Sequence, residues 1–324
     1  MEKIAVLFSG QPRQVDFCST IIKKTLGFLD AEIDYFAHSY NEISVKSLNS
    51  ADDGIKNIKK LEINEVENLY KNNYPITDIK VTDYTEVLKY KQYINSIVNV
   101  YCKDNKVRYT LLGGEPDSVY LTWMGNMYSS QVVNDLKKKH EKENNFKYDL
   151  VVKLRSDIVF HDAFLNMPNV TKRRFLEKCN KGGVKHPIFV TYIQTKGGRI
   201  EVGDFIKWGP SESFDILLND VIKNYYNLVL ESILYYNKHN NNDYKILGLN
   251  NIFDESLPSP ESQWAYMGMK SGVSYIHRPL GTTLARYNVT KADNYDQIQK
   301  KARDFLNEYG KTEKPDEWMK NKLV

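Results

Sequence analysis

A short apolar run at the start of the chain, Ile4–Phe8, is closed by the tight polar segment Ser9-Gly10-Gln11-Pro12-Arg13. An unbroken apolar run of this length is typical of a strand buried on both faces, and Gly and Pro mark the turn that ends it. The next apolar residues recur every three or four positions, as in an amphipathic helix whose first turn could hold Pro12. Strand, tight loop and helix open an α/β unit, so we expect a mixed, mostly parallel Rossmann-type sheet flanked by helices.

Helices and strands alternate along the rest of the chain without a Pro- or Ser-rich linker. A length of 324 residues allows one large domain or two small ones, and this alternation favours a single domain. Periodicity predicts further strands at 31–37, 78–81, 187–194, 201–208 and 273–277, and a buried strand at the beginning of the segment 148–160. It also predicts a surface helix with loops within 49–73, and helices at 123–136, 211–236, 261–269 and 295–309.

Charge and cysteine content exclude several classes of protein. The 45 basic and 41 acidic residues leave a net charge of +4, too small for a nucleic-acid-binding footprint, and we expect the run Lys137–Lys139 to be a solvated face. Three scattered cysteines favour neither a disulfide framework nor a structural zinc site. No apolar run reaches the ~18 residues that a membrane span requires. We therefore expect a cytoplasmic protein without a transmembrane segment.

Ser9, Gly10, Gln11 and Arg13 follow a predicted buried strand. Open α/β sheets bind ligands at the carboxyl ends of their strands, where backbone N–H groups and a helix N-terminus favour an anion. An arginine there can grip a phosphate with two hydrogen bonds. The segment therefore predicts a phosphate-binding loop, although its spacing is neither that of a P-loop nor G-x-G-x-x-G. The alternative is a plain turn followed by a surface arginine.

A second polar cluster interrupts the apolar sequence 148–160. Lys153, Arg155 and Asp157 alternate with other residues, so an extended strand would place all three on one face. Two cations beside a carboxylate suit a metal-bound diphosphate, because Mg²⁺ and Mn²⁺ prefer oxygen ligands and often use one or two carboxylates plus substrate phosphates. A structural salt bridge at a strand end is the alternative.

Five segments in this order resemble a family of GT-A-like glycosyltransferases found in bacterial surface-polysaccharide clusters and in large DNA viruses, WavE-like proteins among them. The similarity spans roughly residues 1 to 280. The matching segments are Ile4–Arg13, Phe36–Tyr40, Tyr148–Ile158, Val202–Glu212 and Pro260–Trp264.

This resemblance implies a GT-A-like domain over 1–290, with residues 1–160 binding the nucleotide sugar and residues 161–290 the acceptor, followed by a helical tail at 291–324. It also implies a nucleotide-diphosphate sugar donor, a glycan or lipid-linked acceptor, and Mn²⁺ or Mg²⁺. His38 and Tyr40 would lie near the base or ribose. The family has Asp-x-Asp where this chain has Arg155-Ser156-Asp157, so only Asp157 carries over as a metal ligand, and His277 resembles the C-terminal histidine of some metal shells.

Two carboxylates are candidates for the acid–base step. An inverting transfer needs a carboxylate that takes the proton of the acceptor hydroxyl. Asp204 interrupts a strand-like segment, and Glu261 follows two prolines at a predicted helix start, where the helix dipole alone would also favour it. We expect Trp123, Trp208 and Trp264 to be core residues rather than the floor of an acceptor site.

Two other functions remain open at this stage. A sugar nucleotidyltransferase also uses a nucleotide-binding α/β sheet, but its glycine-rich G-x-G-[TS]-R signature is not found. A non-catalytic carbohydrate-binding protein on a degenerate transferase fold would explain the missing first aspartate.

Overall fold

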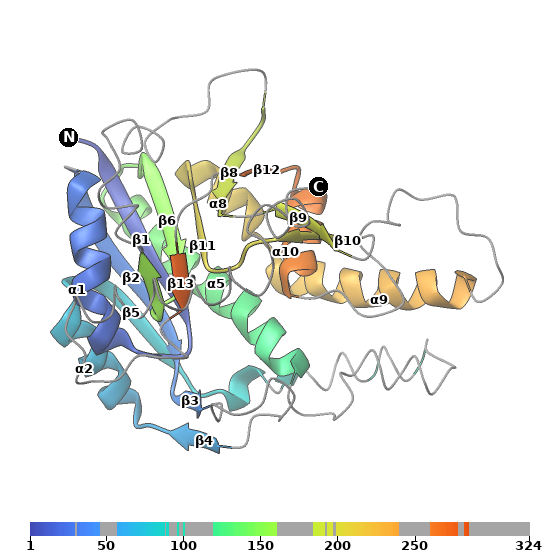
Figure 1. Cartoon of the computed structure of the whole chain (residues 1–324), viewed down its shortest axis with the longest axis horizontal. Helices are drawn as coiled ribbons and strands as arrows, with labels where there is room; N and C mark the ends of the chain where they lie inside the picture. Colours follow the sequence, from blue (N-terminus) through green and yellow to red (C-terminus); the bar gives the residue numbers. More distant parts are fainter. Residues whose placement is uncertain are drawn as a thin grey trace, which may run out of the picture.

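A seven-stranded sheet forms the centre of the protein in the computed structural model (Figure 1). The structure describes residues 1–29, 31–45, 57–87, 89–90, 96, 100, 119–160, 184–191, 193–196, 199–239, 260–277 and 282–284. All seven strands run in the same direction except β11, which is antiparallel to both of its neighbours. The expected mixed, mostly parallel sheet is therefore confirmed. In spatial order the strands are β12 (Ser274–His277), β8 (Pro187–Val190), β11 (Ile206–Gly209), β6 (Leu150–Leu154), β1 (Lys3–Gly10), β2 (Glu32–Tyr40) and β5 (Ile76–Thr82).

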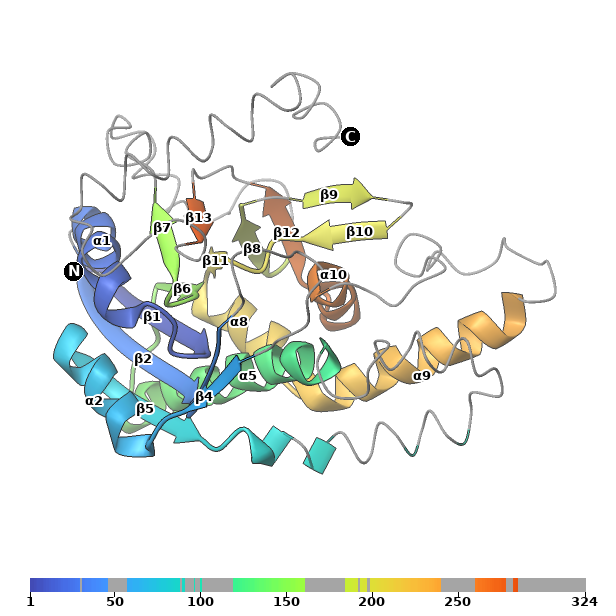
Figure 2. The same cartoon turned by 60° about the horizontal axis from the view of Figure 1, so that its bottom comes forward.

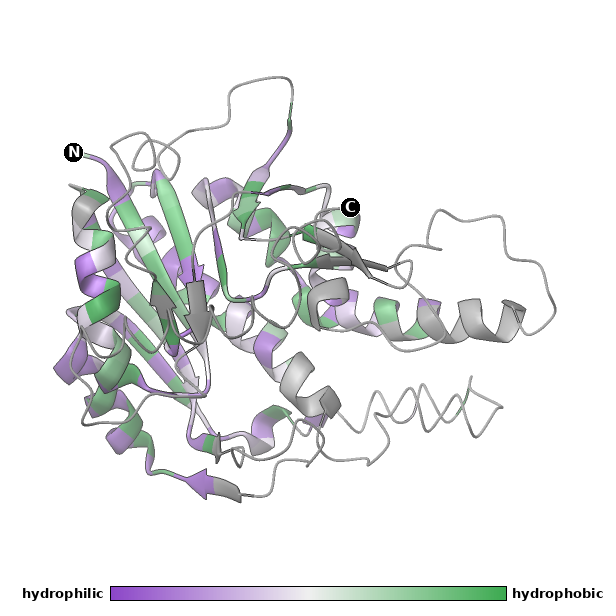
Figure 3. Ribbon diagram, viewed as in Figure 1, coloured by the Kyte–Doolittle hydropathy of each residue, from purple (hydrophilic) through white to green (hydrophobic). Residues whose placement is uncertain are grey.

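Both faces of the sheet are buried because its central strands carry apolar side chains at successive positions. In β1, Ile4, Val6 and Phe8 belong to one hydrophobic cluster, and Ala5 and Leu7 belong to the other. The two clusters are therefore separated by the sheet itself, as period-two alternation requires. Figure 3 shows this apolar character along the central strands.

Helices cover the two faces (Figures 1 and 2). α1 and α2 supply side chains to the cluster on one face, and α5, α8, α9 and α10 supply those on the other. α2 starts with a capping box, in which the Glu65 carboxylate accepts the N–H of Glu62 at 2.9 Å. No helix in the described part of the chain is long and apolar enough to cross a membrane. The helices are α1 (Val15–Leu26), the 3-10 turn η1 (Gly27–Leu29), α2 (Ile63–Asn73), α5 (Val119–Glu143), α8 (Ser211–Leu217), α9 (Val221–His239) and α10 (Pro260–Ser271).

Several elements differ from the sequence predictions at their ends. The second strand continues through Tyr40, and the long helix expected from 211 is divided into α8 and α9 by a turn in which Asp220 has a φ of 51°. Helix α1 starts at Val15, so Pro12 precedes it. The helix expected at 295–309 lies outside the described residues. Three two-stranded ribbons were not anticipated: β3 (Glu42–Val45) with β4 (Asn57–Lys60), β7 (Ile158–Phe160) with β13 (Thr282–Leu284), and β9 (Ile193–Lys196) with β10 (Arg199–Val202).

The lysine run Lys137–Lys139, near the end of α5, was expected to be a solvated face. In the structure it is not uniformly exposed. Lys137 has no exposed surface and donates to Ser211 and, at 2.8 Å, to Asp215. Glu141 accepts from Ser211 at 2.6 Å and lies 3.4 Å from the Lys137 ammonium. The expectation failed for Lys137 because α8 packs against this turn of α5 and brings the acidic partner that makes burial possible.

Candidate functional site

The strand order of the sheet has a topological switch point between β1 and β6. From β1 the chain proceeds through β2 to β5 on one side, and then returns to place β6 on the other side. Ligands of open α/β sheets bind at such a switch point, outside the carboxyl ends of the strands. Phe8 of β1 pairs with Leu154 of β6, so the segments that follow, Ser9–Arg13 and Arg155–Asp157, lie side by side at this edge. The topology thus brings together the two polar segments that the sequence singled out.

Ser156 joins the two segments. Its hydroxyl lies 2.8 Å from the carbonyl oxygen of Arg13 and 3.3 Å from that of Gln11. The hydroxyl of Tyr70, from α2, is hydrogen-bonded to Ser156 and also to Ser39 at the end of β2. Burial raises the pKa of Tyr70 to about 12, and the two serine hydrogen bonds oppose this rise. Three strand ends are therefore tied together by hydroxyl groups, which fixes the loop after β1 against the turn after β6.

Arg155 and Asp157 form a bidentate ion pair within that turn. The Arg155 Nε lies 2.9 Å from one carboxylate oxygen of Asp157, and Nη2 lies 3.0 Å from the other. The third nitrogen, Nη1, lies 3.6 Å from Asp204, which precedes β11. The strand ends at Leu154 and the chain turns at Ser156 and Asp157, so the three alternating residues meet through a turn and not along one extended strand as predicted.

Lys153 and Asp204 are two buried charged residues next to this turn. Lys153 is fully buried, and burial lowers its pKa to about 8 although the charge of Asp204 acts to raise it. Asp204 is itself buried, and its Oδ1 has no hydrogen-bond partner among the described residues. A buried carboxylate oxygen without a donor is costly unless something else binds it. Asp204 is therefore the candidate acid–base group whose geometry the structure describes.

His38 and Tyr40 lie inside the protein, on the α5 side of β2. The ring nitrogens of His38 are hydrogen-bonded to Ser129 at 2.8 Å and Thr82 at 2.9 Å, and the Tyr40 hydroxyl donates to the Gly125 carbonyl at 2.6 Å. Both side chains are buried with their polar atoms paired. They pack between β2 and α5. They therefore do not line the edge of the sheet where we expected a base or ribose.

The pKa of His38 gives a prediction about acid stability. Burial and, secondarily, the charge of Lys80 lower the pKa of His38 to about 3, whereas an unperturbed histidine titrates at 6.5. Between these values the unfolded chain binds a proton that the folded protein excludes, so this contribution to stability is full above pH 6.5 and is lost as the pH falls. Urea unfolding should show that the wild type loses about 2 kcal/mol more than His38→Gln between pH 7 and pH 5. Equal losses would contradict this role for His38.

Ser129 is a residue at this edge that the sequence reasoning missed. Its hydroxyl accepts the N–H of Gly10 at 2.7 Å, where the backbone of Gly10 has a φ of 114° that only glycine adopts readily. The hydroxyl of Ser9, the residue before Gly10, lies 3.5 Å from that of Ser130. Serines at 129 and 130 in the middle of an amphipathic helix were the available signal, because small polar residues on a buried helix face need partners.

Asp157 and His277, the two expected metal ligands, each contact another group and lie in separate elements of the structure. Both oxygens of Asp157 are engaged by Arg155, and His277 Nε2 lies 3.0 Å from the Thr191 carbonyl oxygen at the end of β8. Two strands separate β12, which carries His277, from β6. Among the described residues, no three His, Cys, Asp or Glu side chains are grouped so that they could hold a metal ion. The side chain of Glu261 lies outside the described part, although its backbone is in the first turn of α10.

Comparisons with known proteins give the following results. No family model matches the sequence. No curated protein matches it either. Among solved structures, mouse xyloside xylosyltransferase 1 in its apo form matches with 8% identity and a TM-score of 0.38, over 86% of this chain and 85% of that one. The galactosyltransferase LgtC, in complex with donor and acceptor sugar analogs, matches with 9% identity and a TM-score of 0.37, over 98% of this chain and 99% of that one. Similarity at this level does not bear on the activity of this chain.

Proposed function

We propose that this protein transfers a sugar from a nucleotide-diphosphate sugar to a hydroxyl group of a glycan or lipid-linked acceptor in the cytoplasm. The observation that carries the proposal is the contact between the Ser9–Arg13 loop and the Arg155–Asp157 turn at the switch point of the sheet, joined by the Ser156 hydroxyl. This is the place where an α/β sheet binds a nucleotide. The resemblance of five ordered sequence segments to GT-A-like glycosyltransferases names the reaction.

Positive side chains would stabilise the diphosphate and the charge that grows on it as the sugar leaves. Arg13 lies in the loop after β1, and the side chain of Arg155, in the turn after β6, is 18% exposed. A guanidinium group offers several donors in a fixed plane, which suits phosphate oxygens. Preorganised cations at a leaving group are the electrostatic part of catalysis. We assign this task to the cations of the chain itself.

Asp204 would accept the proton of the attacking hydroxyl. Its Oδ2 lies 3.6 Å from Arg155, so the carboxylate is held beside the group that would bind the diphosphate, and its Oδ1 is left for another donor. A general base must lie within hydrogen-bond reach of the proton that it removes. Glu261, at the start of α10, remains the second candidate for this step.

Thermal unfolding with nucleoside diphosphates tests the proposal. A ligand that binds only the folded state at 100 times its Kd stabilises it by about 2.7 kcal/mol, a rise in Tm of roughly 5 °C for a chain of this size. We expect at least one of the common nucleoside diphosphates to give such a rise in the presence of EDTA as well as with Mn²⁺. Arg13→Gln should weaken this ligand about 10- to 100-fold, because a hydrogen bond to a charged group contributes about 1.5–3 kcal/mol.

Lys23→Gln is the matched control, since Lys23 is an exposed cation on the outer face of α1. Its nucleotide affinity should equal that of the wild type. Stabilisation that requires Mn²⁺ and disappears in Asp157→Ala would restore the metal-ligand role of Asp157. Product analysis then separates the reactions: nucleoside diphosphate released from a nucleotide sugar means sugar transfer, whereas pyrophosphate released from a nucleoside triphosphate would contradict the proposal.

A further inference from the structure

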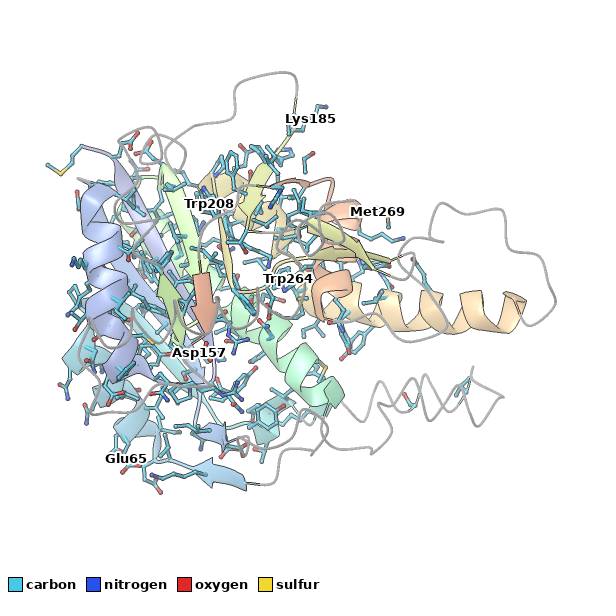
Figure 4. All side chains as sticks on the ribbon, in the orientation of Figure 1. Glu65, Asp157, Lys185, Trp208, Trp264 and Met269 are labelled. Carbon is cyan, nitrogen blue, oxygen red and sulfur yellow. The ribbon has the colours of Figure 1, made fainter. Side chains whose placement is uncertain are left out.

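Tyr70 of α2 is a buried residue whose hydroxyl reaches the candidate site. It is 1% exposed, and its hydroxyl is hydrogen-bonded to Ser39 at the end of β2 and to Ser156 in the turn after β6. In Figure 4 the exposed Glu65 marks α2, and Asp157 marks the turn that contains Ser156. A helix that packs outside the sheet therefore contributes a polar group to the segments that form the site.

The two serines bind the loop after β1 by its carbonyl groups. The Ser39 hydroxyl donates to the carbonyl oxygen of Gly10 at 3.0 Å. The Ser156 hydroxyl donates to that of Arg13 at 2.8 Å. A hydroxyl has one proton, and a carbonyl oxygen can only accept. When both serine protons lie on these carbonyl oxygens, a serine can only accept from Tyr70, whose pKa, raised by burial to about 12, keeps this donor protonated at neutral pH.

The direction of these carbonyl groups determines what the loop presents to a ligand. The peptide bonds of the loop are trans, so in each planar peptide group the carbonyl and the following N–H point in opposite directions. The N–H groups of Gln11 and Gln14, which share peptide groups with the two bound carbonyls, thus point away from the buried hydroxyls. Both residues are partly exposed, so a ligand can reach this side of the loop from solvent. Backbone N–H groups favour an anion, whereas carbonyl oxygens repel it.

We propose that Tyr70 is a positioning residue for the donor diphosphate: acting through Ser39 and Ser156, it keeps the carbonyl groups of the loop after β1 turned away from the ligand. The inference rests on the proposed sugar transfer, in which this loop binds the diphosphate. Tyr70 acts on the ligand only through the two serines, so it is not a catalytic residue. A surface helix was expected within 49–73, and a contribution of this helix to the site was not anticipated.

Tyr74, one turn after Tyr70 at the end of α2, is a tyrosine in the same packing without these contacts. The rings of Tyr74 and Tyr70 lie 4.5 Å and 5.8 Å from the ring of Phe8. Tyr74 is 3% exposed, and its hydroxyl has no hydrogen-bond partner within the described part of the chain. The two tyrosines share their packing on Phe8 and differ in what their hydroxyl groups bind, so Tyr74→Phe is the matched control for Tyr70→Phe.

Calorimetric titration with inorganic pyrophosphate, at a temperature at which every variant is folded, tests this role because pyrophosphate carries the diphosphate group without a base or sugar. Tyr70→Phe keeps the ring and removes the hydroxyl, and we expect it to bind pyrophosphate about 3- to 10-fold more weakly than the wild type, the effect of one hydrogen bond. Ser156→Ala removes the donor to the Arg13 carbonyl and should weaken binding at least as much. Tyr74→Phe should bind like the wild type, with an equal or higher Tm, because a buried hydroxyl without a partner is costly.

A double-mutant cycle with Arg13→Gln separates positioning from a general loss of stability. Arg13 belongs to the loop and is the residue that we expect to contact the diphosphate. If Tyr70 acts through this loop, the two substitutions are coupled, and Tyr70→Phe should weaken pyrophosphate only about twofold when Arg13 is already replaced. Equal factors in both backgrounds would mean that the two residues act independently, which would contradict positioning through the loop.

Two further outcomes would overturn the inference: pyrophosphate failing to bind the wild type, or Tyr70→Phe lowering the Tm while it binds pyrophosphate like the wild type. The second would make Tyr70 a structural residue. If Tyr70→Phe does not fold, Ser39→Ala, which removes the donor to the Gly10 carbonyl, replaces it with the same expected loss. Failure of the proposed function looks different: pyrophosphate would bind and depend on Tyr70, but no nucleotide sugar would release its nucleoside diphosphate.

Discussion

Asp204→Asn should lower the rate of sugar transfer by about 10²- to 10⁴-fold, the contribution typical of a positioned general base. Asparagine keeps the shape of the side chain but cannot accept the proton of the attacking hydroxyl. The oxygen near Arg155, at 3.6 Å, keeps an acceptor in this variant, so the arrangement of the turn should survive. We therefore expect the loss in kcat, with the affinity for nucleoside diphosphate within a few-fold of that of the wild type.

Glu212→Gln is the matched control. Glu212 is an acidic residue in the first turn of α8, on the other side of β11 from Asp204 in the sequence, and its side chain is 77% exposed. Its transfer rate should equal that of the wild type. A fall of less than tenfold for Asp204→Asn, measured as release of nucleoside diphosphate from the donor with acceptor present, would exclude Asp204 as the base. Glu261→Gln would then be the variant to measure.

The position of the site was predictable because it follows from strand order and local chemistry. Ile4–Phe8 and the beginning of the segment 148–160 were predicted to be buried strands, and parallel strands that are adjacent in a sheet end at the same edge. Polar residues directly after such strands are rarely buried in the apolar core, so they are expected at this edge of the sheet. The contact between Ser156 and the Arg13 carbonyl is a detail of this edge that a one-dimensional pattern does not contain.

Pairings between distant segments were not predictable, and they decide what the charged residues do. Alternation along 153–157 suggested one extended face, but the turn at Ser156 lets Arg155 occupy both oxygens of Asp157. The partner of Lys153 is set by the antiparallel register with β11, more than 50 residues later in the sequence. A lysine within the apolar run Phe205–Trp208 was the only local sign that Lys207 is buried.

Lys137→Met should destabilise the fold by about 3 kcal/mol, because removing one partner of a buried ion pair leaves the others uncompensated. Lys137 is fully buried between Asp215 at 2.8 Å and Glu141 at 3.4 Å. Burial lowers the pKa of Lys137, whereas the charges of these two carboxylates raise it. Lys147 still contacts both carboxylates at 2.8 Å and 2.9 Å, which keeps the expected loss near the lower end of the usual range for such pairs. The Tm should fall by roughly 5 °C.

Lys138→Met is the matched control, since the neighbouring side chain is 41% exposed and its nearest acidic partner, Asp135, is 3.9 Å away. Surface substitutions of this kind stay within about 0.5 kcal/mol. Adding Glu141→Gln to Lys137→Met should recover part of the lost stability, because it removes one buried charge that has lost its counter-ion. If the two lysine variants unfold at the same temperature, the packing of α8 against α5 does not depend on this ion pair. Such a result would leave the apolar contacts of Phe214 and Leu217 as what holds α8 in place.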